Sequence, residues 1–183
     1  MIMNQLIAQM VKLGRQWISQ QRTAFRPRGH ALSDGALATF SNFFDRNLLK
    51  NARMVTVPAI DNPPFLEQLR PVLALASVPV LDFSSMAAIT FVDTILLVES
   101  AAKDNLDSLM FHELIHVVQY DILGLDKFVE LFITGWVNQG FNYAAIPLEM
   151  DAYELQYQYE SAPDLSFDVQ DEVSQRLELV MED

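Results

Sequence analysis

Two histidines four residues apart, within His112-Glu113-Leu114-Ile115-His116, lie in a stretch predicted to be helical, residues 104–122. Residues four apart in an α-helix lie one turn apart on the same face, with about 5–6 Å between their Cβ atoms. Both imidazoles can therefore bind one small cation. Glu113 projects from an adjacent part of that face, where it can hold a metal-bound water without being a ligand, as in zinc hydrolases.

The alternative is that these histidines are ordinary polar residues of a half-buried helix. The chain contains only three histidines, and two of them have the spacing of metal ligands with an acid between them. The pattern therefore favours a metal site.

A catalytic zinc commonly has three protein ligands and a water. The chain has no cysteine, so the third ligand is a histidine or a carboxylate. His30 is the only other histidine and lies in a distant loop. Pro147 suits the first position of a helix that carries Glu149, Asp151 and Glu154. Glu149 lies in the first turn and Asp151 points about 200° away from it, so only one of these acids can face the histidines well.

Alternatively, Glu149 is not a ligand and only interacts with the dipole of its helix.

These motifs resemble the gluzincin class of zinc metallopeptidases, in which His-Glu-x-x-His is followed by a separate helix bearing a glutamate. The chain is similar in particular to small bacterial gluzincin-like domains. These contain a hairpin of the type Ala-Ile-Thr-Phe-x-Asp-Thr-Ile, a His-Glu-Leu-x-His-x-x-Gln helix and a Pro-Leu-Glu-x-x-Ala-Tyr segment. Here those pieces occupy residues 88–95, 112–119 and 147–153, so the resemblance covers about 87–157, under half of the chain.

The resemblance implies a zincin-like fold with zinc on His112, His116 and Glu149, and with Glu113 as the general base of peptide-bond hydrolysis. In that reaction, zinc lowers the pKa of its water to about 7 and Glu113 takes the proton. The resemblance also implies that the strand near 94–98 lies along the active-site cleft and pairs with the substrate backbone.

One position departs from the pattern. Many gluzincins place an aspartate four residues after the ligand glutamate to hold a histidine, but this chain has Tyr153 there. The partners of the histidines are therefore unassigned. Candidates for the group that polarises the scissile carbonyl are Tyr120, Tyr143, Tyr153 and His30.

A rival function is a catalytically silent binding or regulatory module that keeps the zinc and the metallopeptidase fold. The intact Glu113 favours the enzyme, because a structural site needs no base between its ligands. The missing aspartate favours the module.

The composition narrows the classes of partner. With 24 acidic and 12 basic side chains, the formal net charge of −12 argues against nucleic acid, whose phosphates require clustered Lys and Arg. The N-terminal 22 residues are amphipathic and lack the unbroken apolar core of a secretory signal. No apolar run approaches the roughly 18 residues of a membrane span. We therefore expect a cytoplasmic protein, and the resemblance implies that it acts on a peptide or protein.

The apolar periodicity predicts a single α+β domain over residues 1–183, mainly helical with a small sheet. Its parts are N-terminal helices and a short strand (1–86), a zinc-site core (87–160) and a C-terminal helix (161–183). Ser33 suits an N-cap, and Gly124 and Gly140 suit helix ends. The expected helices are 3–20, 33–44, 65–70, 104–122, 125–139, 148–159 and 167–181, and the expected strands are 52–57 and a hairpin over 87–99 broken at Val92-Asp93.

Overall fold

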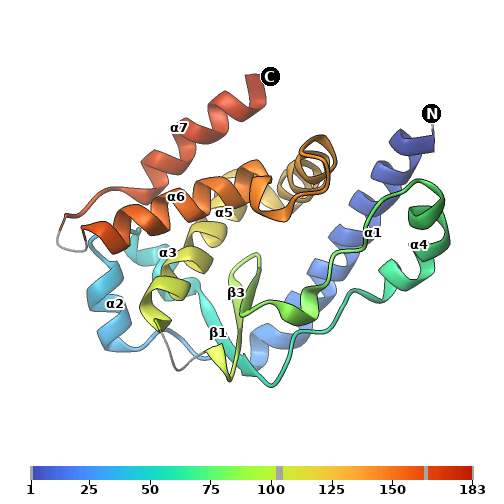
Figure 1. The fold of residues 1–183 in the computed structure, drawn as a ribbon. Helices are drawn as coiled ribbons and strands as arrows, with labels where there is room; N and C mark the ends of the chain where they lie inside the picture. The colour runs from blue at the N-terminus through green and yellow to red at the C-terminus, as the bar shows by residue number, and fades with distance from the viewer. Residues whose placement is uncertain (1, 102–104, 163–164, 183) are drawn as a thin grey trace.

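The computed structural model describes residues 2–101, 105–162 and 165–182. The fold is mainly helical with one small mixed sheet, which confirms the α+β prediction (Figure 1). The helices are α1 (Ile2–Phe25), α2 (Asp34–Phe40), α3 (Arg46–Asn51), α4 (Pro64–Leu75), α5 (Leu106–Asn138), α6 (Pro147–Ser161) and α7 (Val169–Glu182). The strands are β1 (Arg53–Val57), β2 (Ala88–Phe91) and β3 (Thr94–Val98), and short 3-10 turns occupy Arg26–Arg28, Phe83–Ser85 and Tyr143–Ala145.

The three strands have the order β1-β3-β2, with β3 parallel to β1 and antiparallel to β2. The predicted β2–β3 hairpin is present, and its turn has Val92 at φ 63°, as turns of tight hairpins require. Arg22 at the end of α1 donates two hydrogen bonds of 2.8 Å to the Asp93 carboxylate, and Arg26 lies 2.9 Å from it. The hairpin tip is therefore fixed to α1.

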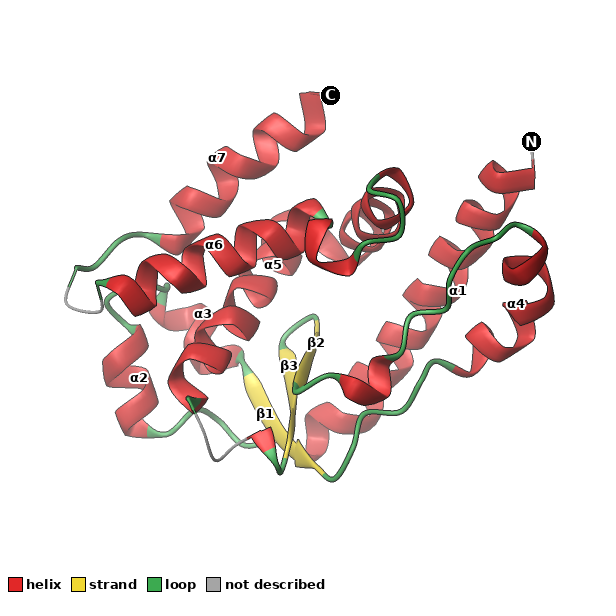
Figure 2. Ribbon diagram, viewed as in Figure 1, coloured by secondary structure: helices red, strands yellow, loops and turns green. Residues whose placement is uncertain are grey.

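The sheet lies between α1 and α5 (Figure 2). Trp17 of α1 packs edge-on against Phe91, with 5.0 Å between ring centroids, in a cluster that includes Val55 and Leu96. Ile95 points to the opposite face and belongs to the main core with α5. β3 is buried on both faces, which explains its continuous apolar sequence.

Helix α5 consists of two segments that meet at Gly124, whose φ of 70° and ψ of 165° are not helical. The glycine therefore interrupts the helix as predicted, but a second segment begins at once. Gly140, at φ 65°, follows the end of α5. The predicted start at residue 104 lies outside the described residues.

An aromatic cluster anchors the start of α5 to its neighbours. Phe111 stacks on Tyr159 of α6 with 4.3 Å between centroids, and Phe43 contacts both rings edge-on. Helices α6 and α7 both pack against α5 (Figure 1). Among the helices of the described residues, none combines the length and apolar character that a membrane span requires.

Candidate metal centre

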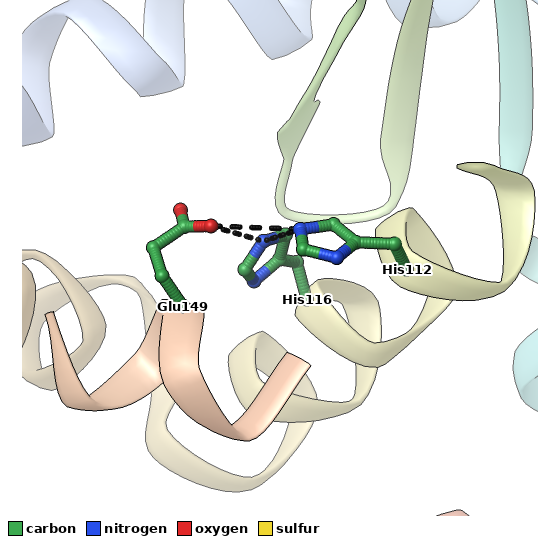
Figure 3. A group of neighbouring side chains, drawn as sticks. All are labelled: His112, His116 and Glu149. Carbon is green, nitrogen blue, oxygen red and sulfur yellow. Dashed lines mark hydrogen bonds and ion pairs between the residues drawn. The ribbon is translucent and has the colours of Figure 1, made fainter. Parts of the chain in front are cut away.

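Three buried side chains converge from two helices. His112 and His116 project from the first segment of α5, and Glu149 projects from the first turn of α6 (Figure 3). The His112 and His116 Nε2 atoms are 3.2 Å apart, and Glu149 Oε2 lies 3.5 Å from the first and 3.6 Å from the second. The three residues are therefore close enough to bind one metal ion.

This triangle fits tetrahedral coordination. Bonds of about 2.0–2.1 Å at tetrahedral angles separate neighbouring ligand atoms by about 3.3–3.4 Å. Glu149 Oε2 is buried and has no hydrogen-bond partner, because both imidazole nitrogens lie beyond hydrogen-bonding distance. Buried polar atoms rarely stay unpartnered, so the atom is placed as a ligand atom would be.

Amide side chains orient both imidazoles. His112 Nδ1 lies 2.9 Å from Gln156 Oε1, and His116 Nδ1 lies 2.8 Å from Gln119 Oε1. Because an amide oxygen only accepts hydrogen bonds, each Nδ1 carries a proton and donates it, and each Nε2 faces the cluster.

Both amides are themselves held in place. Gln119 Nε2 donates at 2.9 Å to the carbonyl oxygen of Leu148, the residue before Glu149. Gln156 Nε2 donates to Ser108 Oγ at 2.7 Å, and the Ser108 hydroxyl donates to Glu160. This network joins α5 to α6 around the site.

Sequence reasoning left the histidine partners unassigned. Gln156 lies three residues beyond Tyr153, the position where many gluzincins have an aspartate, and supplies a neutral partner for His112 from α6. Tyr153 instead packs its ring against His112, with 4.6 Å between centroids. Gln119 could have been found, since a glutamine three residues after His116 lies on the same helix face.

The electrostatics of the cluster favour a cation. Burial disfavours a charge on His116, but the Glu149 carboxylate outweighs burial and raises the pKa of His116 to about 9. Burial would raise the pKa of Glu149, but His116 and His112 outweigh it and lower that pKa below its usual range. Glu149 is therefore ionised, and a metal ion at this position would compete with a proton.

Glu113 is buried next to the ligands without belonging to their triangle. Thr90 Oγ1 of β2 donates to Glu113 Oε2 at 2.6 Å and lies 3.2 Å from the Glu113 carbonyl oxygen. The hairpin therefore fixes the carboxylate that the sequence assigned as general base.

The candidates for polarising the scissile carbonyl differ in whether they contact the cluster or line the adjoining cavity. Tyr143 donates a hydrogen bond of 2.6 Å to Glu149 Oε1. Burial and Glu149 raise the Tyr143 pKa, so its hydroxyl stays protonated. Burial also raises the pKa of Tyr120, which lines the adjoining cavity. His30 pairs with Met54 in an isolated bridge at the sheet and is not among the described residues that line the cavity.

The two alternative acids of α6 face away from the histidines. Arg176 of α7 lies 3.4 Å from Asp151 and donates to Glu154 at 2.6 Å. Of the three acids considered as candidate ligands, Glu149 alone joins the histidines.

A cavity of about 120 Å³ adjoins the cluster. Glu113, His116 and Glu149 line one part of it. The remaining lining is largely apolar and comes from α1, β2, the second segment of α5 and the segment that includes Phe65 and Phe83.

The expected role of the strand at 94–98 is wrong. β3 is the central strand and is hydrogen-bonded to β1 and β2, so it has no free edge for a substrate. β2 is an edge strand of the sheet, and its residues 88–91 line the cavity. The sequence could not show this, because the order of strands depends on the pairing of β3 with a segment 41 residues earlier, as in the pair Arg53 and Thr94.

Comparison of the chain with protein-family models, with curated proteins and with solved structures gives no match.

Proposed function

We propose that the protein is a zinc-dependent peptidase of the gluzincin type with a zincin-like fold. The observation that carries the proposal is the near-equilateral triangle of His112 Nε2, His116 Nε2 and Glu149 Oε2 beside the buried carboxylate of Glu113. Two imidazoles and one carboxylate match the ligand set of catalytic zinc peptidases.

Zinc bound there would polarise the scissile carbonyl and acidify a water. The protein side chains supply the rest. Glu113, held by Thr90, takes a proton from the attacking water and returns it to the departing amine nitrogen. Gln156 and Gln119 keep the two imidazoles aligned while this occurs.

The edge position of β2 supports a peptide as the substrate. An extended chain can add to the free edge of a sheet through backbone hydrogen bonds. Residues 88–91 line the cavity that contains Glu113, so a peptide paired there would run past the base.

The test compares the wild type with Glu113→Gln. The amide keeps the size of the side chain but cannot accept the proton, so metal content and fold should be preserved while peptide cleavage falls by orders of magnitude. Cleavage should also stop when a chelator removes the metal. The measurement is turnover of a broad peptide library by zinc-loaded protein, with zinc content determined on the same samples.

The rival module predicts another outcome. Zinc-loaded wild type would then cleave no peptide above the Glu113→Gln background, and a captured partner would bind both proteins equally. That result would reject the peptidase.

A further inference from the structure

We infer that the substrate carries one large apolar side chain, an aromatic ring or a branched aliphatic group, next to the scissile bond, and that this group fills the cavity between α1 and the second segment of α5. The inference rests on the proposed function, which places the scissile bond at the ligand cluster. It adds the chemical class of the substrate.

The cavity is apolar except where it meets the ligands. Its walls include Met10 and Trp17 of α1, and Phe128, Ile133 and Trp136 of α5. No lysine or arginine is among the described residues that line it, whereas Glu113 and Glu149 do line it. A carboxylate would find no cationic side chain there and would lose its hydration against an apolar lining, so an acidic side chain is disfavoured. An apolar group gains from burial.

The size of the cavity sets the size of the group. Its volume of about 120 Å³ is slightly below that of an apolar cavity of roughly 150 Å³ that binds benzene. One ring or one branched side chain therefore fits.

Binding in the cavity can be followed by tryptophan fluorescence. Trp17 and Trp136 both line the cavity, and they are the only two tryptophans of the chain. A ligand that enters the cavity therefore changes the intrinsic fluorescence of the protein.

The experiment compares three small hydroxamic acids that share one zinc-binding group. They are 3-phenylpropanohydroxamic acid, acetohydroxamic acid and the monohydroxamate of succinic acid. Their affinities for zinc-loaded protein are measured by calorimetry and by tryptophan fluorescence. The phenyl compound should bind on the order of 10- to 100-fold more tightly than acetohydroxamic acid, because its ring is buried. The succinic compound should bind more weakly than acetohydroxamic acid.

Matched variants locate the effect. Ile133→Phe places a ring in the cavity and should reduce the phenyl advantage to about threefold or less, since the burial gain is lost. Ile18→Phe, on the opposite wall, should do the same. Ile122→Phe is the control, because Ile122 lies on α5 but is exposed and is not a lining residue. Circular dichroism checks that each variant is folded.

The outcomes separate the two proposals. If acetohydroxamic and 3-phenylpropanohydroxamic acids bind zinc-loaded wild type equally, or if the phenyl advantage survives both filling substitutions, the inference is wrong and the metal site stands.

If the protein binds no zinc, the proposed function fails. Benzyl alcohol is then titrated into the same protein, and a tryptophan signal that saturates in the wild type but not in Ile133→Phe supports the cavity as an apolar subsite. No signal in the wild type overturns it.

Discussion

The acidic side chains at the candidate centre carry the charge that a divalent ion would need for neutralisation. Glu149 and Glu113 carry one negative charge each when ionised, and the two imidazoles are oriented by the neutral amides of Gln156 and Gln119. A divalent ion would therefore be neutralised by the two carboxylates. An aspartate at position 153, as in many gluzincins, would add a third negative charge to this buried cluster. Neutral partners suit a site that already has a buried base.

The ligand assignment predicts the effect of removing each of the three candidate acids, Glu149, Asp151 and Glu154. Glu149→Ala should lower zinc affinity by well over the roughly 10- to 100-fold that follows loss of a ligand's hydrogen-bond partner. Asp151→Ala and Glu154→Ala should keep their zinc, because both acids face Arg176. Elemental analysis of purified variants checks this. Full zinc content in Glu149→Ala would exclude the assignment.

The contact between Thr90 and Glu113 gives a second prediction at this scale. Thr90→Val keeps the shape of the side chain but leaves the buried Glu113 carboxylate without its donor, which should cost about 1–3 kcal/mol of the free energy of unfolding. Thr90→Ser keeps the hydroxyl and should recover most of that loss. Urea unfolding of the three zinc-loaded proteins measures it. Equal stability of Thr90→Val and the wild type would mean that the hydrogen bond contributes nothing.

The site residues that could be predicted from the sequence are those that lie close together in the chain or that fit a known spacing. His112, His116 and Glu113 follow from one turn of helix, and Glu149 follows from the resemblance and the proline that starts its helix. Thr90 and Gln156 could not be assigned, because their contacts depend on how the hairpin and α6 cross α5. Such crossings arise from packing of side chains distant in sequence.

Among the elements, the contact between α5 and the start of α6 positions Glu149. A Cβ atom on Gly135 would lie 2.8 Å from Pro147 Cδ, two residues before Glu149. The proline ring is rigid, so the two helices approach this closely only because residue 135 has no side chain.

We therefore expect Gly135→Ala to push the first turn of α6 away from α5. The variant should lose about 1–3 kcal/mol of the free energy of unfolding through overpacking, and its zinc affinity should fall. Gly35→Ala is the matched control, because a Cβ there meets only Ser33 Oγ at 3.9 Å. That change should leave zinc affinity unchanged and stabilise α2 by about 0.4–1 kcal/mol. Urea unfolding and zinc titration of both variants test this. Wild-type zinc affinity in Gly135→Ala would show that the close approach does not position the ligand.

Element boundaries were predicted well where a cap or a turn formed by neighbouring residues determines them. Ser33 accepts a hydrogen bond from the Ala36 N–H as an N-cap, and the hairpin turns at Val92-Asp93. Helix α4, in contrast, continues to Leu75 through Pro71, although its expected end was residue 70.

Long-range packing explains the differences. The buried Leu69 and Leu73 lie on either side of Pro71, and their burial outweighs the hydrogen bond that the proline removes. Helix α1 continues beyond residue 20 to Phe25, where Arg22 binds Asp93 of the hairpin. Neither contact is visible in a local pattern.

At the scale of the whole molecule, the candidate centre lies where α5, α6 and the hairpin meet within a large hydrophobic core. That core joins residues from α1 to α7, including Leu6, Phe111, Leu148 and Leu177. Its aromatic and aliphatic contacts do not require a metal. A metal would therefore add stability to a structure that already has a core, unlike a zinc finger, which is unfolded without its ion.

Removal of zinc should accordingly lower the melting temperature without unfolding the protein at 25 °C. Binding to the folded state alone stabilises it by about 4 kcal/mol when free zinc is about 1,000-fold above Kd, which raises the Tm of a chain of this length by on the order of 10 °C. Circular dichroism melts of zinc-loaded and chelator-treated protein measure the shift, with metal loss confirmed by elemental analysis. Glu149→Ala provides the control, because its Tm should no longer respond to zinc. An unchanged Tm after confirmed metal loss would mean that the ion does not connect α5 to α6, and a far-ultraviolet spectrum typical of an unfolded chain would mean that the core depends on the metal.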